Sequence, residues 1–254
     1  MEIAELLGIL RSVAVYRLRP LHHAGLVRLY RPFVPAGGLA FDIGAHVGDR
    51  VRAFRTLGAR VVAVEPGSAA MRVLRLLHGR DARVLLVAAA AGAADGEADL
   101  RINSRNPTVS TISPGFPAGM AGAPGWERQR WDRLVRVRVT TLDALVAAHG
   151  RPDFVKIDVE GHEAAVLSGV SPDNAPPALS FEVIMAARKG GLAAVARAAA
   201  LGYRHFRLVL GETHRFHGSW SDAAGIERLL RGLPAEANSG DVYAARDGHP
   251  ALDG

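Results

Sequence analysis

Residues 39–50 have the sequence Leu-Ala-Phe-Asp-Ile-Gly-Ala-His-Val-Gly-Asp-Arg. An apolar run typical of a buried strand passes into a turn with Gly44 and Gly48, after which the apolar residues follow helical spacing. Glycine lets the backbone approach a ligand closely, and the free N–H groups that begin a helix attract a carboxylate or a phosphate. The stretch therefore predicts a strand, a cofactor-binding loop and a helix.

A second acidic residue, Glu65, follows the next apolar run and precedes Pro66. Ligands of an open α/β sheet bind beyond the carboxyl ends of its strands, so we expect Glu65 to lie near Asp42. A carboxylate at this strand end can accept hydrogen bonds from both hydroxyls of a ribose. Three residues separate Gly44 from Gly48, which departs from the dinucleotide pattern Gly-x-Gly-x-x-Gly. We therefore expect S-adenosylmethionine and not a dinucleotide.

Short apolar strands alternate with helical segments from residue 39 onward, the pattern of a parallel sheet covered by helices. The expected strands are 39–43, 60–64, 83–87, 154–157, 178–183, 203–210 and 242–245, with further strands at 98–102 and 135–139. The polar loop 103–125 is a candidate lid. We expect a short N-terminal helical extension, 1–34, and one main domain, 35–254.

Composition narrows the classes of partner. The formal net charge is +6, yet only two of the 31 basic residues are lysines and the arginines are spread along the chain, so a nucleic-acid partner is not favoured. The chain lacks cysteine, which excludes disulfides and thiolate chemistry. No apolar run reaches the roughly 18 residues of a membrane span. A cytoplasmic protein is expected, and association into a homo-oligomer is left open.

The segment Lys156-Ile-Asp-Val-Glu-Gly-His-Glu163 carries charge at the end of an apolar strand. Strand alternation is expected to place Lys156, Asp158 and Glu160 on one face. Packing does not explain a lysine and two acids at such a strand end. The segment therefore indicates a catalytic or binding site.

Three residues are candidate catalytic groups. Asp158 and His162 are candidate general bases, and Glu182 at the end of the next strand is a third. Asp158 could instead pair with Lys156 or bind the amine of the cofactor. A Mg²⁺ ion between Asp158 and Glu182 is not favoured, because the sequence places no third oxygen ligand. A metal pair of His214 and His217 is also open, although loop histidines are more often plain surface residues.

Taken together, residues 42–49, 64–66, 141–145 and 154–169 resemble the FkbM family of S-adenosylmethionine-dependent methyltransferases. The resemblance implies a class I methyltransferase fold, a Rossmann-like α/β domain. Its seven-stranded, mostly parallel sheet would have an antiparallel last strand and helices on both faces. It also implies O-methylation of a small hydroxylated acceptor, a sugar or a secondary metabolite. The implied cofactor-binding residues are Asp42, Gly44, Ala45, His46, Gly48, Glu65, Pro66 and Asp158.

One position departs from the family, which commonly has asparagine where this chain has His46. Methyl transfer to nitrogen or to RNA is the nearest rival function. The common nitrogen-methylating motif, Asn/Asp-Pro-Pro-aromatic, does not follow strand 154–157, which favours hydroxyl chemistry. A dinucleotide-dependent oxidoreductase is less favoured, because the first loop lacks the third glycine.

Overall fold

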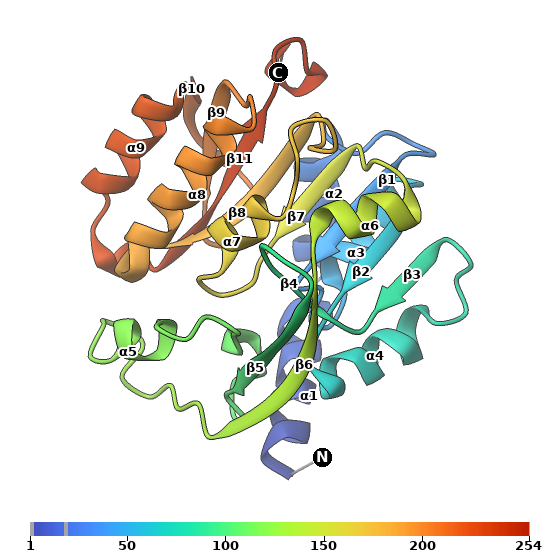
Figure 1. The fold of residues 1–254 in the computed structure, drawn as a ribbon, viewed down its shortest axis with the longest axis vertical. Helices are drawn as coiled ribbons and strands as arrows, with labels where there is room; N and C mark the ends of the chain where they lie inside the picture. The colour runs from blue at the N-terminus through green and yellow to red at the C-terminus, as the bar shows by residue number, and fades with distance from the viewer. Residues whose placement is uncertain (1–2, 18–19, 254) are drawn as a thin grey trace.

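A large twisted sheet forms the centre of the molecule (Figure 1). The computed structural model describes residues 3–17 and 20–253. The strands of the large sheet are β1 (Leu39–Ile43), β2 (Arg60–Val64), β3 (Val84–Val87), β7 (Phe154–Ile157), β8 (Ala178–Ile184), β9 (His205–Leu210), β10 (Phe216–Ser221) and β11 (Ser239–Ala245). They lie in the order β10-β9-β11-β8-β7-β1-β2-β3. The neighbours from β3 to β8 pair in parallel, and β11 is antiparallel to both β8 and β9. The mostly parallel sheet with an antiparallel last strand is confirmed.

The described sheet has eight strands where seven were expected, and β10 is the additional one. It pairs with β9 at the edge, and its register shifts between His217 and Ser221. Its sequence, Phe-His-Gly-Ser-Trp-Ser, has a glycine at its centre and no run of β-branched residues. The usual pattern of a strand is therefore missing, although the edge of β9 still offers hydrogen bonds.

The strands expected at 98–102 and 135–139 pair with each other outside the large sheet. They belong to β5 (Gly96–Ile102) and β6 (Arg133–Thr140), which form a small sheet with β4 (Ala90–Ala91). The segment between β5 and β6 contains η1 (Pro107–Val109) and α5 (Phe116–Met120). Trp126 and Trp131 pack edge-on against Phe116, and the indole N–H of Trp131 donates to the carbonyl of Val109 over 2.8 Å. Both tryptophans therefore belong to the packed interior of this segment.

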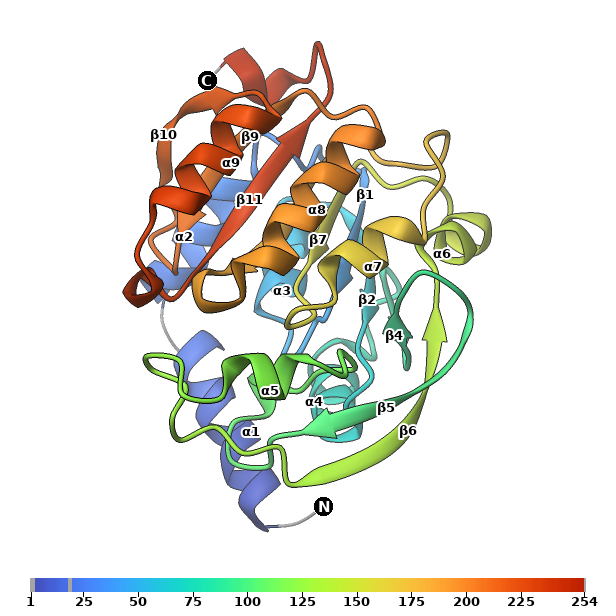
Figure 2. The same ribbon diagram turned by 60° about the vertical axis from the view of Figure 1, so that its left-hand side comes forward.

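Helices cover both faces of the large sheet (Figure 2). One face carries α2 (Pro20–Tyr30), α3 (Asp49–Thr56) and α4 (Ser68–His78), and the other carries α6 (Leu142–His149), α7 (Glu163–Ser168), α8 (Arg188–Ala200) and α9 (Ala223–Gly232). Short turns η2 (Met185–Ala187), η3 (Ala235–Ala237) and η4 (Pro250–Asp253) complete the described elements. Strand alternation divides the core, since Phe41 faces α6 to α9 whereas Ala40 faces α2 to α4.

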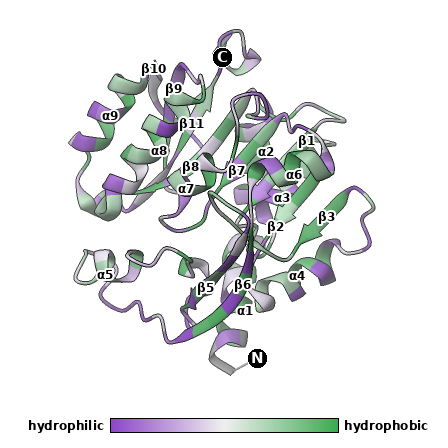
Figure 3. Ribbon diagram, in the orientation of Figure 1, coloured by the Kyte–Doolittle hydropathy of each residue, from purple (hydrophilic) through white to green (hydrophobic). Residues whose placement is uncertain are grey.

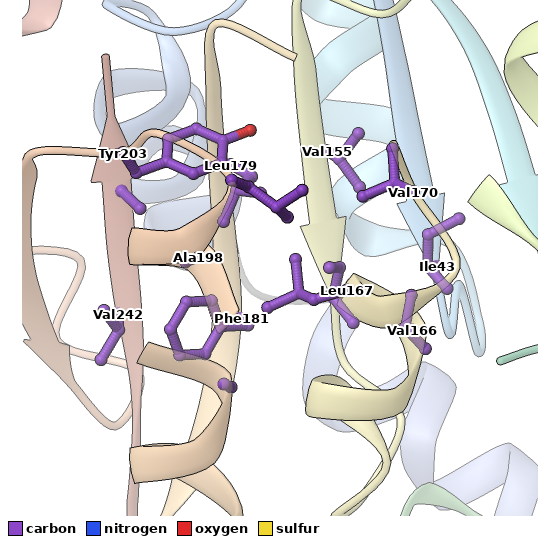
Figure 4. Close-up of a cluster of buried hydrophobic side chains, with 14 of the residues drawn as sticks. Ile43, Val155, Val166, Leu167, Val170, Leu179, Phe181, Ala198, Tyr203 and Val242 are labelled. Carbon is purple, nitrogen blue, oxygen red and sulfur yellow. The ribbon is translucent and has the colours of Figure 1, made fainter. Parts of the chain in front are cut away.

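The buried strands are hydrophobic along most of their length, whereas β5 and β6 include hydrophilic residues (Figure 3). Figure 4 shows Ile43, Val155 and Phe181 of the sheet facing Leu167 of α7 and Ala198 of α8. These five side chains are essentially inaccessible to solvent. Burying each of the larger ones contributes about 1.5–3 kcal/mol, so the strand ends are held on a rigid layer.

The expected N-terminal extension contains α1 (Ile3–Arg17) and α2, and its boundary at residue 35 stays a prediction. On α1, Ile9 packs against Ala69 and Ala70 of α4. Glu5 accepts a hydrogen bond from the guanidinium of Arg133 over 2.9 Å, which joins α1 to β6. Within the described residues, none of the helices combines the length and the apolar character needed to cross a lipid bilayer.

Candidate functional site

Charged side chains gather where three neighbouring strands, β1, β7 and β8, end and the antiparallel β11 begins, on the face covered by α2 and α3. Asp42 of β1 lies opposite Lys156 of β7, and Asp241 of β11 lies opposite Glu182 of β8. Strand alternation puts these side chains on the same face as the buried ring of Phe154. The apolar interior of this face therefore ends in a charged region at the carboxyl ends of the parallel strands.

The loop from β1 to α3 is shaped by two glycines with left-handed backbone. Gly44 has a φ of 87°, and a side chain there would collide with the backbone carbonyl of Asp158. Gly48 has a φ of 77° at the N-cap of α3, and a Cβ would lie 2.8 Å from the side chain of Leu74. At Gly44 both the backbone angle and the nearby backbone carbonyl require glycine, whereas at Gly48 the left-handed backbone angle is the main requirement.

Glu65 ties this loop to the end of β2. Its Oε2 accepts the backbone N–H of His46 over 2.9 Å, and its Oε1 accepts that of Gly67 over 2.6 Å. Ala45, between the glycines, donates its own N–H to the carbonyl of Val64 over 3.0 Å. Burial raises the pKa of Glu65 to about 7, although the two backbone hydrogen bonds oppose this shift. A carboxylate has about four acceptor positions, so two remain for a ligand.

His46 has a left-handed backbone with a φ of 46°. Burial lowers the pKa of its imidazole to about 4, so the ring is neutral near pH 7. The ring meets Tyr16 of α1 edge-on at 6.4 Å between centroids, and its Nε2 lies 3.4 Å from the hydroxyl of Thr108. Asparagine tolerates left-handed backbone well, which is a physical reason for the asparagine common in the family.

Two cavities meet at this loop. The first is lined by Gly44, His46, Glu65, Pro66, by apolar Ala90, Leu100 and Ile112, and by Thr108 and Asp158 among others. The second is lined mainly by polar side chains, including Tyr16, Asp42, Asp49, Arg50, Asp158, Glu160, Glu182, Glu212 and Asp241. Both cavities are lined by Gly44, His46, Thr108, Asp158 and Glu160. The first cavity, lined by apolar residues together with Glu65, therefore opens into an acidic one through a junction that includes Asp158 and Glu160.

Lys156 lies fully buried beneath the acidic cavity. Its Nζ donates to Oδ1 of Asp241 over 2.7 Å and to the carbonyl of Ile157 over 3.4 Å, and it lies 3.3 Å from Oδ2 of Asp158. Burial alone would lower the pKa of Lys156, but the carboxylates of Asp158 and Asp241 raise it well above its ordinary value. The ammonium therefore stays charged and holds the two carboxylates at fixed positions.

Asp42 is 1% exposed, and its Oδ2 has no hydrogen-bond partner among the described residues. Burial and the neighbouring Asp49 raise the pKa of Asp42 to about 7, although Arg50 and Lys156 oppose the shift. A buried carboxylate oxygen without a donor is costly. Because Asp42 also lines the acidic cavity, this oxygen can accept a donor from a ligand.

The acids after β7 lie on a turn and not on an extended strand. The expectation that strand alternation aligns Asp158 with Glu160 is wrong, because β7 ends at residue 157 and Glu160 has a φ of 54°. Oε1 of Glu163 accepts the backbone N–H groups of Val159 over 3.1 Å and Gly161 over 3.2 Å. The turn nevertheless brings Asp158 and Glu160 into the same cavity.

The sequence analysis did not identify several further residues at the second cavity or in contact with its lining. Arg50 donates to Asp49 over 2.6 Å and to Glu212 over 3.1 Å, and His22 lies 3.2 Å from the carboxylate of Asp49. Tyr16 lines the same cavity. Arg50 follows the glycine loop directly, so its position in the sequence could have indicated that it belongs to the site. The others depend on how distant segments meet.

Not every candidate residue reaches the cavities. His162 is the N-cap residue of α7 and lies outside the described lining of both cavities. His214 lies near His22 and Glu212, whereas His217 is exposed on β10 and is not part of that group. Gly48 packs closely against Leu74, and Pro66 lines the first cavity. The functional roles of the candidate residues stay predictions.

A comparison with protein families assigns this fold and site to a class. A family model described as the methyltransferase FkbM domain matches residues 42–233. The chain therefore belongs to the FkbM methyltransferase family and is an S-adenosylmethionine-dependent methyltransferase. The expected family, cofactor and class I methyltransferase fold are confirmed.

Solved structures with distant similarity include other methyltransferases. The O-methyltransferase from Bacillus cereus in complex with SAH is 11% identical, with 97% of this chain and 92% of that chain covered and a TM-score of 0.47. The TehB-like SAM-dependent methyltransferase from Corynebacterium glutamicum is 10% identical, with 93% and 94% covered and a TM-score of 0.46. Aeropyrum pernix fibrillarin with bound S-adenosyl-L-methionine is 10% identical, with 84% and 68% covered and a TM-score of 0.44. No curated protein matches the chain.

Proposed function

We propose that this enzyme transfers the methyl group of S-adenosylmethionine to a hydroxyl of a small acceptor. The observation that carries the proposal is the junction of the two cavities, where Gly44, His46 and Asp158 line both. A cofactor that fills the apolar cavity would present its reactive end at this junction. The acceptor would then occupy the acidic cavity, within reach of Asp158.

The residues of the first cavity, with Asp42 and Ala45 of the second, fit the cofactor. Glu65 has two acceptor positions left for the ribose hydroxyls, and Leu100 and Ile112 offer apolar surface for the adenine ring. The unpartnered oxygen of Asp42 suits the ammonium of the amino-acid end. Asp158 is a second candidate for that ammonium. Gly44, Ala45 and His46 bring backbone close to the same end of the ligand.

Methyl transfer requires alignment of the acceptor and removal of one proton. S-adenosylmethionine supplies an activated methyl group, so the acceptor oxygen gains the C–O bond as the C–S bond breaks and SAH leaves. Asp158 is placed to accept the hydroxyl proton, because its side chain is 28% exposed at the junction. Lys156 positions that carboxylate. Glu182 is the alternative acceptor, and His162 is not proposed because it lies outside the described cavity lining.

The charge of the second cavity favours a hydroxylated acceptor over RNA. Its lining includes the carboxylates of Asp42, Asp49, Asp158, Glu160, Glu182, Glu212 and Asp241, against one arginine, Arg50. Such a surface repels phosphates, whereas RNA binding depends on their neutralisation by basic side chains. Carboxylates are instead good acceptors for hydroxyl donors.

Two measurements test the proposal. Calorimetric titration with S-adenosylmethionine, SAH and NAD should give binding heat for the first two compounds. Heat with NAD alone would overturn the methyltransferase assignment. Methyl-labelled S-adenosylmethionine is then supplied with pairs of sugars that differ only in one hydroxyl or amine. Label on oxygen supports the proposal, and label found only on the amines would overturn it.

A further inference from the structure

Three carboxylates converge in the second cavity. Asp158, Glu160 and Glu182 each offer one oxygen, and these three oxygens lie within 4.8 Å of one another. They come from the end of β7, the turn that follows it and the end of β8. Three ionised carboxylates at such distances repel strongly, and either a proton or a cation among them relieves the repulsion.

Two of these oxygens lack a partner. Glu160 is only 6% exposed, and its Oε2 is buried with no hydrogen-bond partner among the described residues. Oε2 of Glu182 is buried and unpartnered in the same way. A buried carboxylate oxygen without a donor or a cation costs more than an ordinary missing hydrogen bond. These oxygens therefore need a ligand that is positively charged or donates hydrogen bonds.

The neighbouring cations are already engaged elsewhere. The ammonium of Lys156 is used by Asp241, Asp158 and a backbone carbonyl. The guanidinium of Arg50 is used by Asp49 and Glu212. Neither forms an ion pair with Glu160 or Glu182 in the described part of the chain. The protein thus leaves a position for an external cation.

The turn holds Glu160 in place. Its backbone has a φ of 54°, which is costly for glutamate, and its carbonyl accepts the hydroxyl of Thr111 over 2.8 Å. Glu163 fixes the flanking N–H groups of Val159 and Gly161. Surrounding contacts therefore hold the carboxylate of Glu160 in the cavity before any ligand binds.

A second group of possible metal ligands among the described residues consists of His22, Glu212 and His214. Unlike Glu160 and Glu182, its carboxylate already has a partner. Glu212 is already paired with Arg50, and His22 with Asp49. Its acid therefore already has a counter-charge. We do not propose a metal there.

We propose that Asp158, Glu160 and Glu182 bind one divalent cation of the Mg²⁺ or Mn²⁺ type. Oxygen ligands without sulfur or imidazole favour these hard ions. Three protein ligands leave other coordination positions open toward the cavity, where an acceptor hydroxyl could bind. A bound cation would lower the pKa of that hydroxyl and so assist its deprotonation. This catalytic use rests on the proposed function, whereas cation binding itself does not.

Binding of Mn²⁺ tests the site directly. The full chain, saturated with SAH, is titrated with Mn²⁺ while free ion is followed by electron paramagnetic resonance. One tightly bound Mn²⁺ per chain, displaced by excess Mg²⁺, is expected. Glu160→Gln and Glu182→Gln should each weaken binding by roughly 10- to 100-fold or more, since even losing a group that only supports a metal ligand has an effect of that size. Glu236→Gln, an exposed carboxylate on η3, is the matched control and should change nothing.

The outcomes separate this proposal from the proposed function. No Mn²⁺ binding, or binding that both cavity variants retain, would overturn the cation site. If O-methylation then continued in a chelator, the proposed function would still stand. Mn²⁺ binding that both cavity variants lose would support the site, even if every hydroxylated acceptor failed. Circular dichroism and SAH titration of each variant exclude misfolding as the cause.

Discussion

Replacing Glu65 with glutamine should weaken SAH binding strongly while the fold persists. The carboxylate accepts two backbone N–H groups and has two acceptor positions free for the ribose. Glutamine keeps the shape but turns an N–H₂ group toward one of the backbone donors. One or two charge-assisted hydrogen bonds are lost, about 2–4 kcal/mol, which corresponds to roughly a 30- to 1,000-fold increase in Kd. Isothermal titration calorimetry with SAH measures this change.

The free energy of unfolding of the same variant should depend on pH differently from that of the wild type. The pKa of Glu65 rises from 4.5 to about 7 on folding, so its stabilising contribution is present below pH 4.5 and is lost as the pH rises through 7. The shift corresponds to about 3 kcal/mol. Glutamine does not ionise, so urea unfolding should show the wild type losing about that much relative to Glu65→Gln between pH 4.5 and pH 8.

Glu97→Gln is the matched control for both measurements. Glu97 lies exposed on β5 and pairs with Arg136 over 3.2 Å, away from both cavities. Its replacement should leave the Kd for SAH unchanged. A Kd for Glu65→Gln within about threefold of the wild type would refute the assignment of Glu65 to the ribose.

Asp158→Asn should lower turnover, measured by label transfer, by about 100-fold or more. The Kd for SAH, measured by calorimetry, should change little. Unchanged turnover would show that Asp158 takes no part in the chemistry. Gly44→Ala should abolish SAH binding in calorimetry, because its Cβ would collide with the carbonyl of Asp158; retained affinity would contradict the close approach. His46→Asn should keep the Kd for SAH within about threefold, since asparagine also adopts left-handed backbone and keeps the N–H that Glu65 accepts. The affinity of the wild type for SAH should fall as the pH drops below 7, because the protonated carboxyl of Glu65 loses acceptor capacity; a flat profile from pH 8 to pH 5.5 would oppose this.

Local chemistry explains how much of the site could be predicted from the sequence. Gly44 and Gly48 both have left-handed backbone, which favours glycine, and at Gly44 the backbone carbonyl of Asp158 also excludes a side chain. The glycines themselves therefore indicate this loop in the sequence. Glu65 follows a strand that apolar residues define. The order of strands then brings the two strand ends together.

Long-range contacts explain what could not be predicted. Tyr16 reaches the second cavity from α1, and Glu212 meets Arg50 from the segment between β9 and β10. Neither sequence neighbourhood carries a motif. Glu160 was expected on an extended strand, whereas the hydrogen bonds of Glu163 fold that segment into a turn. The sequence predicted Glu160 near Asp158, but the convergence of both with Glu182 became apparent only from the folded structure.

A crystal structure of the complex with SAH would show directly how the cofactor binds. We expect both ribose hydroxyls within hydrogen-bond distance of Glu65, the adenine in the apolar cavity and the sulfur at the junction beside Asp158. Ribose bound away from Glu65, or a sulfur atom that does not face the acidic cavity, would contradict this expectation.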